Sequence, residues 1–288
     1  MSGESPAPGV PTVTVSAHEV RPITDEEFER FRRFIYEQAG IAMSPQKRHL
    51  VAGRLHKRLQ AQGIRTYGEY YRRVLADPDG RERQLLIDLL TTNETYFFRE
   101  PEHFALLQQQ ILPRYRGRRL RLWSAACSSG EEVYSLAMVC AEVLGDGDWE
   151  VHGSDISQRM LTAARQGVYP LDRARHLPTD LLRRYCLKGV RSHAGQLRVS
   201  EELRARTRFS AVNLQQPLRL DTRYPVIFLR NVLIYFDPPT KQGVVQRIAR
   251  ALAPGGHLFV SHVESLHGVD SPLRMQQPSV FQLPEPSP

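Results

Sequence analysis

Small residues and one acid, placed at the ends of two predicted strands, form the part of the sequence best suited to bind a ligand. Residues 120–126, LRLWSAA, predict a buried strand, and CSSG then leads into a helix predicted from Glu131. Small side chains let the backbone approach a ligand, and a helix N-terminus offers it free N–H groups. A second predicted strand, 149–153, precedes Asp155, and an acid there binds ribose hydroxyls in doubly wound folds. Because the turn lacks G-x-G-x-x-G, an ordinary βαβ unit is the alternative.

Further motifs surround this unit. TNET and FFRE stand within residues 92–100, SAACSSGEE at 124–132, SDIS at 154–157 and RNVLIYFD at 230–237. At these spacings and in this order they resemble the CheR family of chemoreceptor protein-glutamate O-methyltransferases. The resemblance covers about Ile23 to Phe281, and Val133 departs from it where the family pattern has proline.

The resemblance implies both a fold and a function. The expected α/β fold is an S-adenosylmethionine-dependent, Rossmann-like methyltransferase domain with a small N-terminal all-helical domain and a small inserted β-subdomain. The implied activity moves a methyl group from S-adenosylmethionine to receptor glutamates, leaving S-adenosylhomocysteine. The implied partner is the helical cytoplasmic domain of chemoreceptors, with no nucleic-acid partner and no membrane insertion, and we expect a cytoplasmic monomer.

Site residues follow from the same resemblance. Arg99 and Tyr235 are the predicted catalytic residues, and Glu132 is preferred to Glu131 as a cofactor contact. The predicted cofactor-binding set is Asn93, Thr95, Arg99, Glu132, Asp155, Asn213, Leu214, Asn231 and Val232. A glutamate is already ionised near pH 7, since its unperturbed pKa is about 4.3, so the reaction requires no general base. Alignment of the reactants contributes most of the rate, up to about 7–11 kcal/mol in favourable systems.

Each of these residues also has a structural explanation. Asp155 would serve as a helix N-cap, and Arg99 would form a surface ion pair with Glu102 three residues on. Asn213 would be a turn former and Tyr235 a core aromatic. These alternatives remain open at the level of sequence.

Two other functions are alternatives to the receptor methyltransferase. The segment Asp237-Pro238-Pro239 resembles the D/N-P-P motif of methyltransferases that act on bases, and the formal charge of +8 would suit nucleic acid. An Asp N-cap followed by proline explains this segment better. A degenerate relative acting as a scaffold is the second alternative; the presence of Arg99 and Tyr235 favours an enzyme.

Composition sets further limits. Hydrophobic residues make up 41% and charged residues 24%, as in soluble globular proteins. The longest apolar runs stay short of the roughly 20 residues of a membrane span, and the N-terminus lacks the pattern of a secretory signal. Three cysteines and ten histidines show no ligand spacing, so we expect no metal site.

The periodicity divides the chain into segments. Residues 1–20 predict a disordered tail, 21–76 a helical domain, 85–288 the methyltransferase domain and 187–206 its β-subdomain. In the helical domain, Thr24, Glu27 and Gly40 predict the ends of a first helix. A second helix runs from after Pro45 to near Gly63, and a third covers 67–76. Strands are predicted at 119–125, 149–153, 208–212, 225–230, 256–262 and near 279–283.

The helical domain is basic. Residues 21–75 carry twelve Lys or Arg against six Asp or Glu, and Lys47, Arg54 and Arg58 share one face of the second helix. Receptor methylation regions are acidic coiled coils in the family, so the resemblance implies that this face docks the receptor. A solvated basic face is the alternative.

Overall fold

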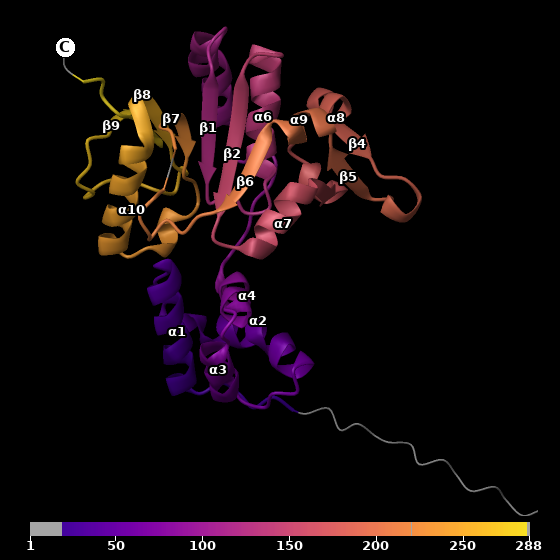
Figure 1. The fold of residues 1–288 in the computed structure, drawn as a ribbon, viewed down its shortest axis with the longest axis vertical. Helices are drawn as coiled ribbons and strands as arrows, with labels where there is room; N and C mark the ends of the chain where they lie inside the picture. Colours follow the sequence, from indigo (N-terminus) through magenta and orange to yellow (C-terminus); the bar gives the residue numbers. More distant parts are fainter. Residues whose placement is uncertain (1–18, 220, 287–288) are drawn as a thin grey trace, which may run out of the picture.

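A helical domain lies at one end of a larger α/β domain in the computed structural model, which describes residues 19–219 and 221–286 (Figure 1). The tail predicted for 1–20 lies outside the described residues except for its last two. Of these, Val20 is buried in the helical domain, and the next residue, Arg21, donates its backbone N–H to Arg65 O. Val20 therefore belongs to the helical domain. Among the described residues, no helix combines the length and apolar character needed to cross a membrane.

The N-terminal domain contains four helices: α1 Asp25–Ala39, α2 Arg48–Ala61, α3 Tyr67–Ala76 and α4 Arg81–Leu90. The predicted ends of α1 are confirmed, since Thr24 and Glu27 form a capping box and Gly40 ends the helix with φ 72°. One apolar cluster, in which Phe31 and Leu55 are fully buried, holds the four helices together.

The helical domain is one helix longer than predicted. Leu86, Ile87 and Leu90 of α4 belong to its buried cluster, because α4 packs against α1, α2 and α3. The methyltransferase domain, expected from residue 85, thus begins after α4. On α2, Val51 is buried, whereas its neighbour Leu50 is 37% exposed.

Seven strands form the central sheet in the order β6-β2-β1-β7-β8-β10-β9. Their bounds are β1 Leu120–Ala125, β2 Trp149–Asp155, β6 Thr207–Ala211, β7 Tyr224–Phe228, β8 Leu252–Phe259, β9 Arg274–Gln277 and β10 Val280–Gln282. The first five strands of this order run parallel, and β10 runs antiparallel to both of its neighbours. All six predicted strands are present, whereas β9 was not predicted.

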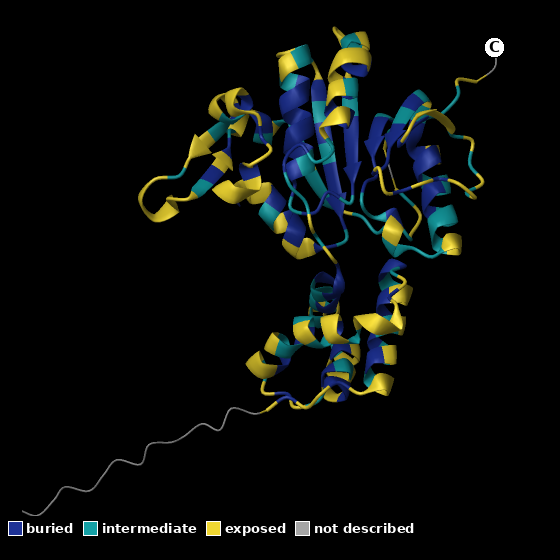
Figure 2. Ribbon diagram, turned by 180° about the vertical axis from the view of Figure 1, so that it is seen from behind, coloured by how far each residue is buried: buried dark blue, intermediate teal, exposed yellow. Residues whose placement is uncertain are grey.

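Helices cover the sheet, whose central strands β1 and β7 are largely buried, whereas the edge strands β6 and β9 are more exposed (Figure 2). Helices α6 Glu131–Leu144, α7 Gln158–Gln166 and α9 Glu201–Ala205 pack along β2 and β6, and α10 Pro238–Ala251 packs on β8. Helix α5 Pro101–Leu106 continues into a π-helical turn at Leu107–Ile111 that contacts α6. The arrowheads of β1 and β2 point towards the helical domain (Figure 1). The carboxyl ends of the parallel strands, where such sheets bind ligands, therefore face that domain.

A second sheet of three short strands forms the β-subdomain. Its order is β3-β5-β4, with β3 Val168–Pro170, β4 Cys186–Lys188 and β5 Gln196–Val199, and α8 Thr179–Tyr185 lies between β3 and β4 along the chain. The antiparallel strands β4 and β5 lie at the predicted place of the β-subdomain. The predicted range 187–206 is displaced, because β3 extends the β-subdomain back to Val168 and residues 201–205 form α9, which packs on α6.

Candidate active site

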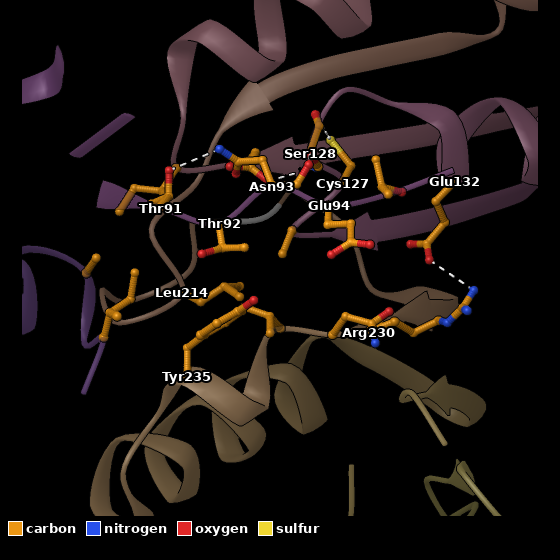
Figure 3. A pocket seen from close by; sticks show the side chains of 18 of the residues that line it. Thr91, Thr92, Asn93, Glu94, Cys127, Ser128, Glu132, Leu214, Arg230 and Tyr235 are labelled. Atoms are coloured by element: carbon orange, nitrogen blue, oxygen red, sulfur yellow. Dashed lines mark hydrogen bonds and ion pairs between the residues drawn. The ribbon is translucent and has the colours of Figure 1, made fainter. Parts of the chain in front are cut away.

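One pocket lies between the carboxyl ends of the strands and the helical domain (Figure 3). It holds about 890 Å³ of empty space, part of which is open to solvent. Every residue predicted to bind the cofactor or to act in catalysis lines it: Asn93, Thr95, Arg99, Glu132, Asp155, Asn213, Leu214, Asn231, Val232 and Tyr235. The fold thus gathers residues up to 142 positions apart, from Asn93 to Tyr235, around one cavity.

The turn between β1 and α6 brings backbone to the pocket. Ala126, Ser128 and Gly130 all have positive φ, of 71°, 50° and 94°. At Gly130 a Cβ atom would lie 2.8 Å from the Cβ of Ala164, so glycine is required there for packing as well as for conformation. The small residues of this turn therefore permit the close approach of backbone to ligand that the sequence predicts.

Asp155 ends β2 and is 6% exposed. One carboxylate oxygen accepts from the backbone N–H of Ser128 at 2.8 Å, and the other accepts from that of Ser157 at 2.9 Å. Burial raises the pKa of Asp155, and these N–H groups oppose the shift. Ser157, not Asp155, is the N-cap of α7, so the helix-cap explanation of Asp155 is wrong. Each carboxylate oxygen keeps a lone pair for a further donor from the pocket.

Glu132 and Arg230 form a buried ion pair on the pocket wall. The carboxylate of Glu132 lies 3.2 Å from the Arg230 guanidinium and accepts from Ser124 Oγ at 2.7 Å. Burial raises the pKa of Glu132, while Arg230 opposes the shift. Glu131 lies outside the pocket lining and pairs with Arg173 at 3.0 Å. The preference for Glu132 over Glu131 therefore agrees with the geometry, although its cofactor contact stays a prediction.

Arg230 is a site residue that the sequence analysis missed. Its side chain is 1% exposed and also pairs with Glu100 at 3.2 Å. It packs beside the rings of Phe104 and Phe228, each 5.8 Å from the guanidinium carbon. The available signal was an arginine directly after the apolar strand β7, a position where a buried cation needs carboxylate partners.

Arg99 lies in the loop that precedes α5. Its guanidinium donates to Glu94 O at 3.0 Å and lies 5.6 Å from the ring centre of Tyr96. The ion pair with Glu102, considered as an alternative, is not formed, because Glu102 lies beside His262 at 3.6 Å. Within residues 19–219 and 221–286, Arg99 has no carboxylate partner. The pocket therefore presents one cation to whatever anion enters it.

The loop after β7 carries Asn231 and Tyr235. Asn231 has φ 57°, and its backbone N–H donates to Glu264 at 2.9 Å. The buried Glu264 carboxylate also accepts from the N–H groups of Leu233 and Ser261, so it fixes the shape of this loop. A 3-10 turn at 233–235 places Tyr235 opposite Ser128 across the cavity (Figure 3).

The Asp-Pro-Pro segment begins α10. Asp237 accepts from Thr240 N at 3.0 Å as the N-cap of that helix, with proline at its first positions. The N-cap interpretation of this segment is thus confirmed. Asp237 also lies outside the pocket lining, so the structure gives it no place in the site.

The helical domain supplies part of the pocket wall, which the sequence analysis missed. Ala39 and Ile41 line the cavity, and Ile41 forms an antiparallel bridge with Phe236. Asn213 donates its side-chain amide to Gln38 O at 2.7 Å. No sequence pattern marks such contacts, since they join segments nearly 200 residues apart.

Two of the three basic side chains predicted to dock the receptor make contacts within the protein instead. Arg54 donates to Leu90 O at 2.6 Å and to Thr92, beside the pocket, and Arg58 pairs with Glu82 at 2.5 Å. Lys47 is exposed. Arg54 and Arg58 therefore support the helical domain and its junction with the site, and of the three only Lys47 keeps an outward-facing charge available for docking.

Comparisons with known proteins agree with this architecture. The family model "CheR methyltransferase, SAM binding domain" matches residues 93–281, and "CheR methyltransferase, all-alpha domain" matches residues 26–91. The chain is 38% identical over 264 residues to a chemotaxis protein methyltransferase of Salmonella typhimurium, covering 91% of each protein. It is 37% identical to that of Escherichia coli, covering 91% of this chain and 92% of the other, and 41% identical to chemotaxis protein methyltransferase 2 of Pseudomonas aeruginosa, covering 84% and 87%.

These matches confirm the predicted fold class and the predicted cofactor, S-adenosylmethionine, and the buried acid at the end of β2 suits its ribose. The chain belongs to the CheR methyltransferase family, with an all-α domain followed by a methyltransferase domain that binds S-adenosylmethionine.

Proposed function

We propose that this protein methylates glutamate side-chain carboxylates of chemoreceptors, forming methyl esters. The observation that carries the proposal is Arg99, a cation on the pocket wall without a carboxylate partner among the described residues. The names of the relatives, chemotaxis protein methyltransferases, indicate the same substrate class. Receptor adaptation in the cytoplasm, by a monomer, is the setting that we propose.

Different residues of the pocket bind different parts of S-adenosylmethionine. Asp155 binds the ribose hydroxyls at the end of β2, and Asn213 and Leu214 after β6 contact the adenine ring. Glu132, Asn93 and Thr95 surround the methionine portion, and Arg99 binds a carboxylate, that of the methionine portion or that of the substrate. Asn231 and Val232 lie beside the transferred methyl group, with Tyr235 orienting the incoming glutamate.

The chemistry requires positioning more than proton transfer. The cofactor supplies an electrophilic methyl group on a sulfonium; a glutamate oxygen bonds to the methyl carbon as the carbon–sulfur bond breaks and its electron pair stays on sulfur. Both reactants lose charge towards the transition state, so a partly desolvated pocket favours the reaction. Arg99 and Tyr235 hold the carboxylate in line, and no residue needs to remove a proton because the substrate is already ionised near pH 7.

The partner surface includes the exposed Lys47 of the helical domain. The substrate region of a receptor is a helical, acidic surface, and an exposed lysine attracts it in a salt-dependent way. The β-subdomain presents a second surface, since β4 is an edge strand on which Leu187 is 62% exposed. Strand addition of a receptor peptide at this edge is the docking mode known for some family members.

The decisive experiment incubates the protein with methyl-labelled S-adenosylmethionine and receptor cytoplasmic fragments. Carboxyl methyl esters release volatile methanol in mild alkali, whereas N-methyl groups do not. We expect base-labile label on receptor glutamates and its loss in Arg99→Ala. Cofactor binding without any base-labile label would favour a scaffold, and label on nucleic acid would contradict the proposal.

A further inference from the structure

Three side chains from two distant parts of the chain converge beside the pocket but outside its lining. Glu100 stands at the start of α5, His103 lies in its first turn and His262 follows β8. One ligand atom from each lies within 4.8 Å of the others. His103 Nδ1 is 3.4 Å and His262 Nε2 is 4.0 Å from the same Glu100 oxygen, Oε2.

A single serine orients both histidines. Ser279 Oγ donates to Pro278 O at 2.6 Å, and it lies 2.7 Å from His103 Nε2 and 3.2 Å from His262 Nδ1. When the hydroxyl donates its hydrogen to Pro278 O it accepts from both rings, and these two nitrogens then carry the hydrogens, which is the arrangement that a bound metal ion would require. The lone pairs of the neutral rings then lie on His103 Nδ1 and His262 Nε2, the atoms that approach Glu100.

His103 Nδ1 is a buried acceptor with no hydrogen-bond partner among the described residues. His103 is 1% exposed, so bulk water does not supply the missing partner of Nδ1. A lone pair and a carboxylate oxygen at 3.4 Å repel each other unless a cation lies between them. Eight buried side-chain atoms lack a partner among the described residues, and His103 Nδ1 is the one that belongs to a cluster of possible metal ligands.

The surrounding charge suits a divalent cation. Arg230 touches Glu100 Oε2 at 3.2 Å, but Glu132, at 3.2 Å from the same guanidinium, offsets its charge. Glu100 and Glu102 are then left with two negative charges, and Glu102, 72% exposed and 3.6 Å from His262 Nε2, would turn inward to become a fourth ligand. Ser261 Oγ, donating at 2.9 Å, fixes the other oxygen of Glu100.

We propose that Glu100, His103 and His262, with Glu102, form a binding site for a divalent transition-metal ion of the zinc class. Imidazole ligands select such ions over Mg²⁺ or Ca²⁺. Tetrahedral zinc with bonds of about 2.0–2.1 Å separates its ligands by roughly 3.3–3.4 Å. The pair at 3.4 Å already meets this spacing, and the side chain of His262, 45% exposed, has room to close the remainder. Shared hydrogen bonding of both ring N–H groups to Ser279 is the usual support of metal-bound histidines.

The test titrates ZnCl2 into the full chain, produced without a histidine tag and stripped with a chelator, by isothermal titration calorimetry. We expect one Zn²⁺ per chain and a rise in Tm on saturation. His262→Ala should weaken binding at least about tenfold and abolish the rise in Tm. Because His262 is half exposed, this variant should fold, and its Tm without metal verifies that.

The matched control is His267→Ala, which removes another exposed histidine five residues away. It should bind Zn²⁺ as the unmodified protein does. Absence of saturable binding below about 1 mM Zn²⁺, or equal losses in the two variants, would overturn the proposal. In that case a proton, and not a metal ion, lies between His103 Nδ1 and Glu100 Oε2.

Discussion

The buried Arg230 should dominate the stability of the site wall. Arg230→Met keeps much of the side-chain volume but leaves the carboxylates of Glu100 and Glu132, 15% and 14% exposed, without their cation. Removing one partner of a buried ion pair costs about 3–5 kcal/mol. Since whole proteins are stable by only about 5–15 kcal/mol, we expect a large part of the free energy of unfolding to be lost.

Urea unfolding followed by tryptophan fluorescence measures this loss, because Trp123 and Trp149 lie on β1 and β2 and report on the sheet. The control is Arg208→Met, whose partner Glu150 lies 2.7 Å away but whose own side chain is 72% exposed. That surface pair should contribute about 1 kcal/mol or less. Adding Glu132→Gln to Arg230→Met should restore stability, because it removes one of the uncompensated charges.

The pH dependence gives the sharpest test. Burial raises the pKa of Glu132 and Arg230 opposes the rise, so loss of Arg230 raises the folded-state pKa further. When a carboxyl has a higher pKa in the folded state than in the unfolded state, the folded protein holds its proton more tightly. The free energy of unfolding therefore falls as the pH rises from the unfolded-state pKa, about 4.3, through the folded-state pKa. The defect of Arg230→Met should therefore be larger at pH 8 than at pH 5. A defect below 1 kcal/mol, or one larger at pH 5, would refute the reasoning.

Three further changes test the site and its surroundings. Asp155→Asn should weaken S-adenosylmethionine binding by about 1.5–3 kcal/mol, measured by calorimetry, and unchanged affinity in a folded variant would rule out its ribose contact. Gly130→Ala should lower the free energy of unfolding by more than about 1 kcal/mol, because the φ of Gly130 is 94° and the new Cβ would meet Ala164. The control Gly53→Ala, in α2 where no atom lies near the new Cβ, should instead raise the free energy of unfolding. Lys47→Glu should reduce receptor methylation without changing cofactor affinity; an equal effect of Lys57→Glu, on the helix α2 that follows Lys47, would indicate general charge attraction instead of docking.

The sequence was sufficient to predict those parts of the structure that depend on a local pattern of residues. Caps, alternating strands and the small-residue turn before Gly130 are local signals, so the first helix, the strand positions and the fold class were predictable. The pocket residues were predictable because each stands at a strand end or in a motif of the family. The third strand of the β-subdomain was missed because Val168–Pro170 is short and pairs with β5, some 28 residues away along the chain.

What could not be predicted depends on contacts between distant segments. Helix α4 looks like a connector in sequence, and only its packing against three other helices assigns it to the first domain. Arg54 and Arg58 appear as a solvent-facing stripe until Glu82 and Leu90 O are placed beside them. The meeting of His103 with His262 is invisible to spacing rules, since 159 residues separate them.

The junction between the two domains has a consequence for evolution and engineering. Ile41 and Phe236 pair through the backbone, Ala42 N donates to Tyr235 O at 2.8 Å, and Asn213 recognises the carbonyl of Gln38. On the helical side, all three contacts use main-chain atoms, which every amino acid possesses. The outer surface of the helices is therefore free to diverge towards new partners while the loop bearing Tyr235 keeps its shape. A helical domain grafted from a relative should retain the pocket if the crossover point preserves the backbone path of residues 38–42.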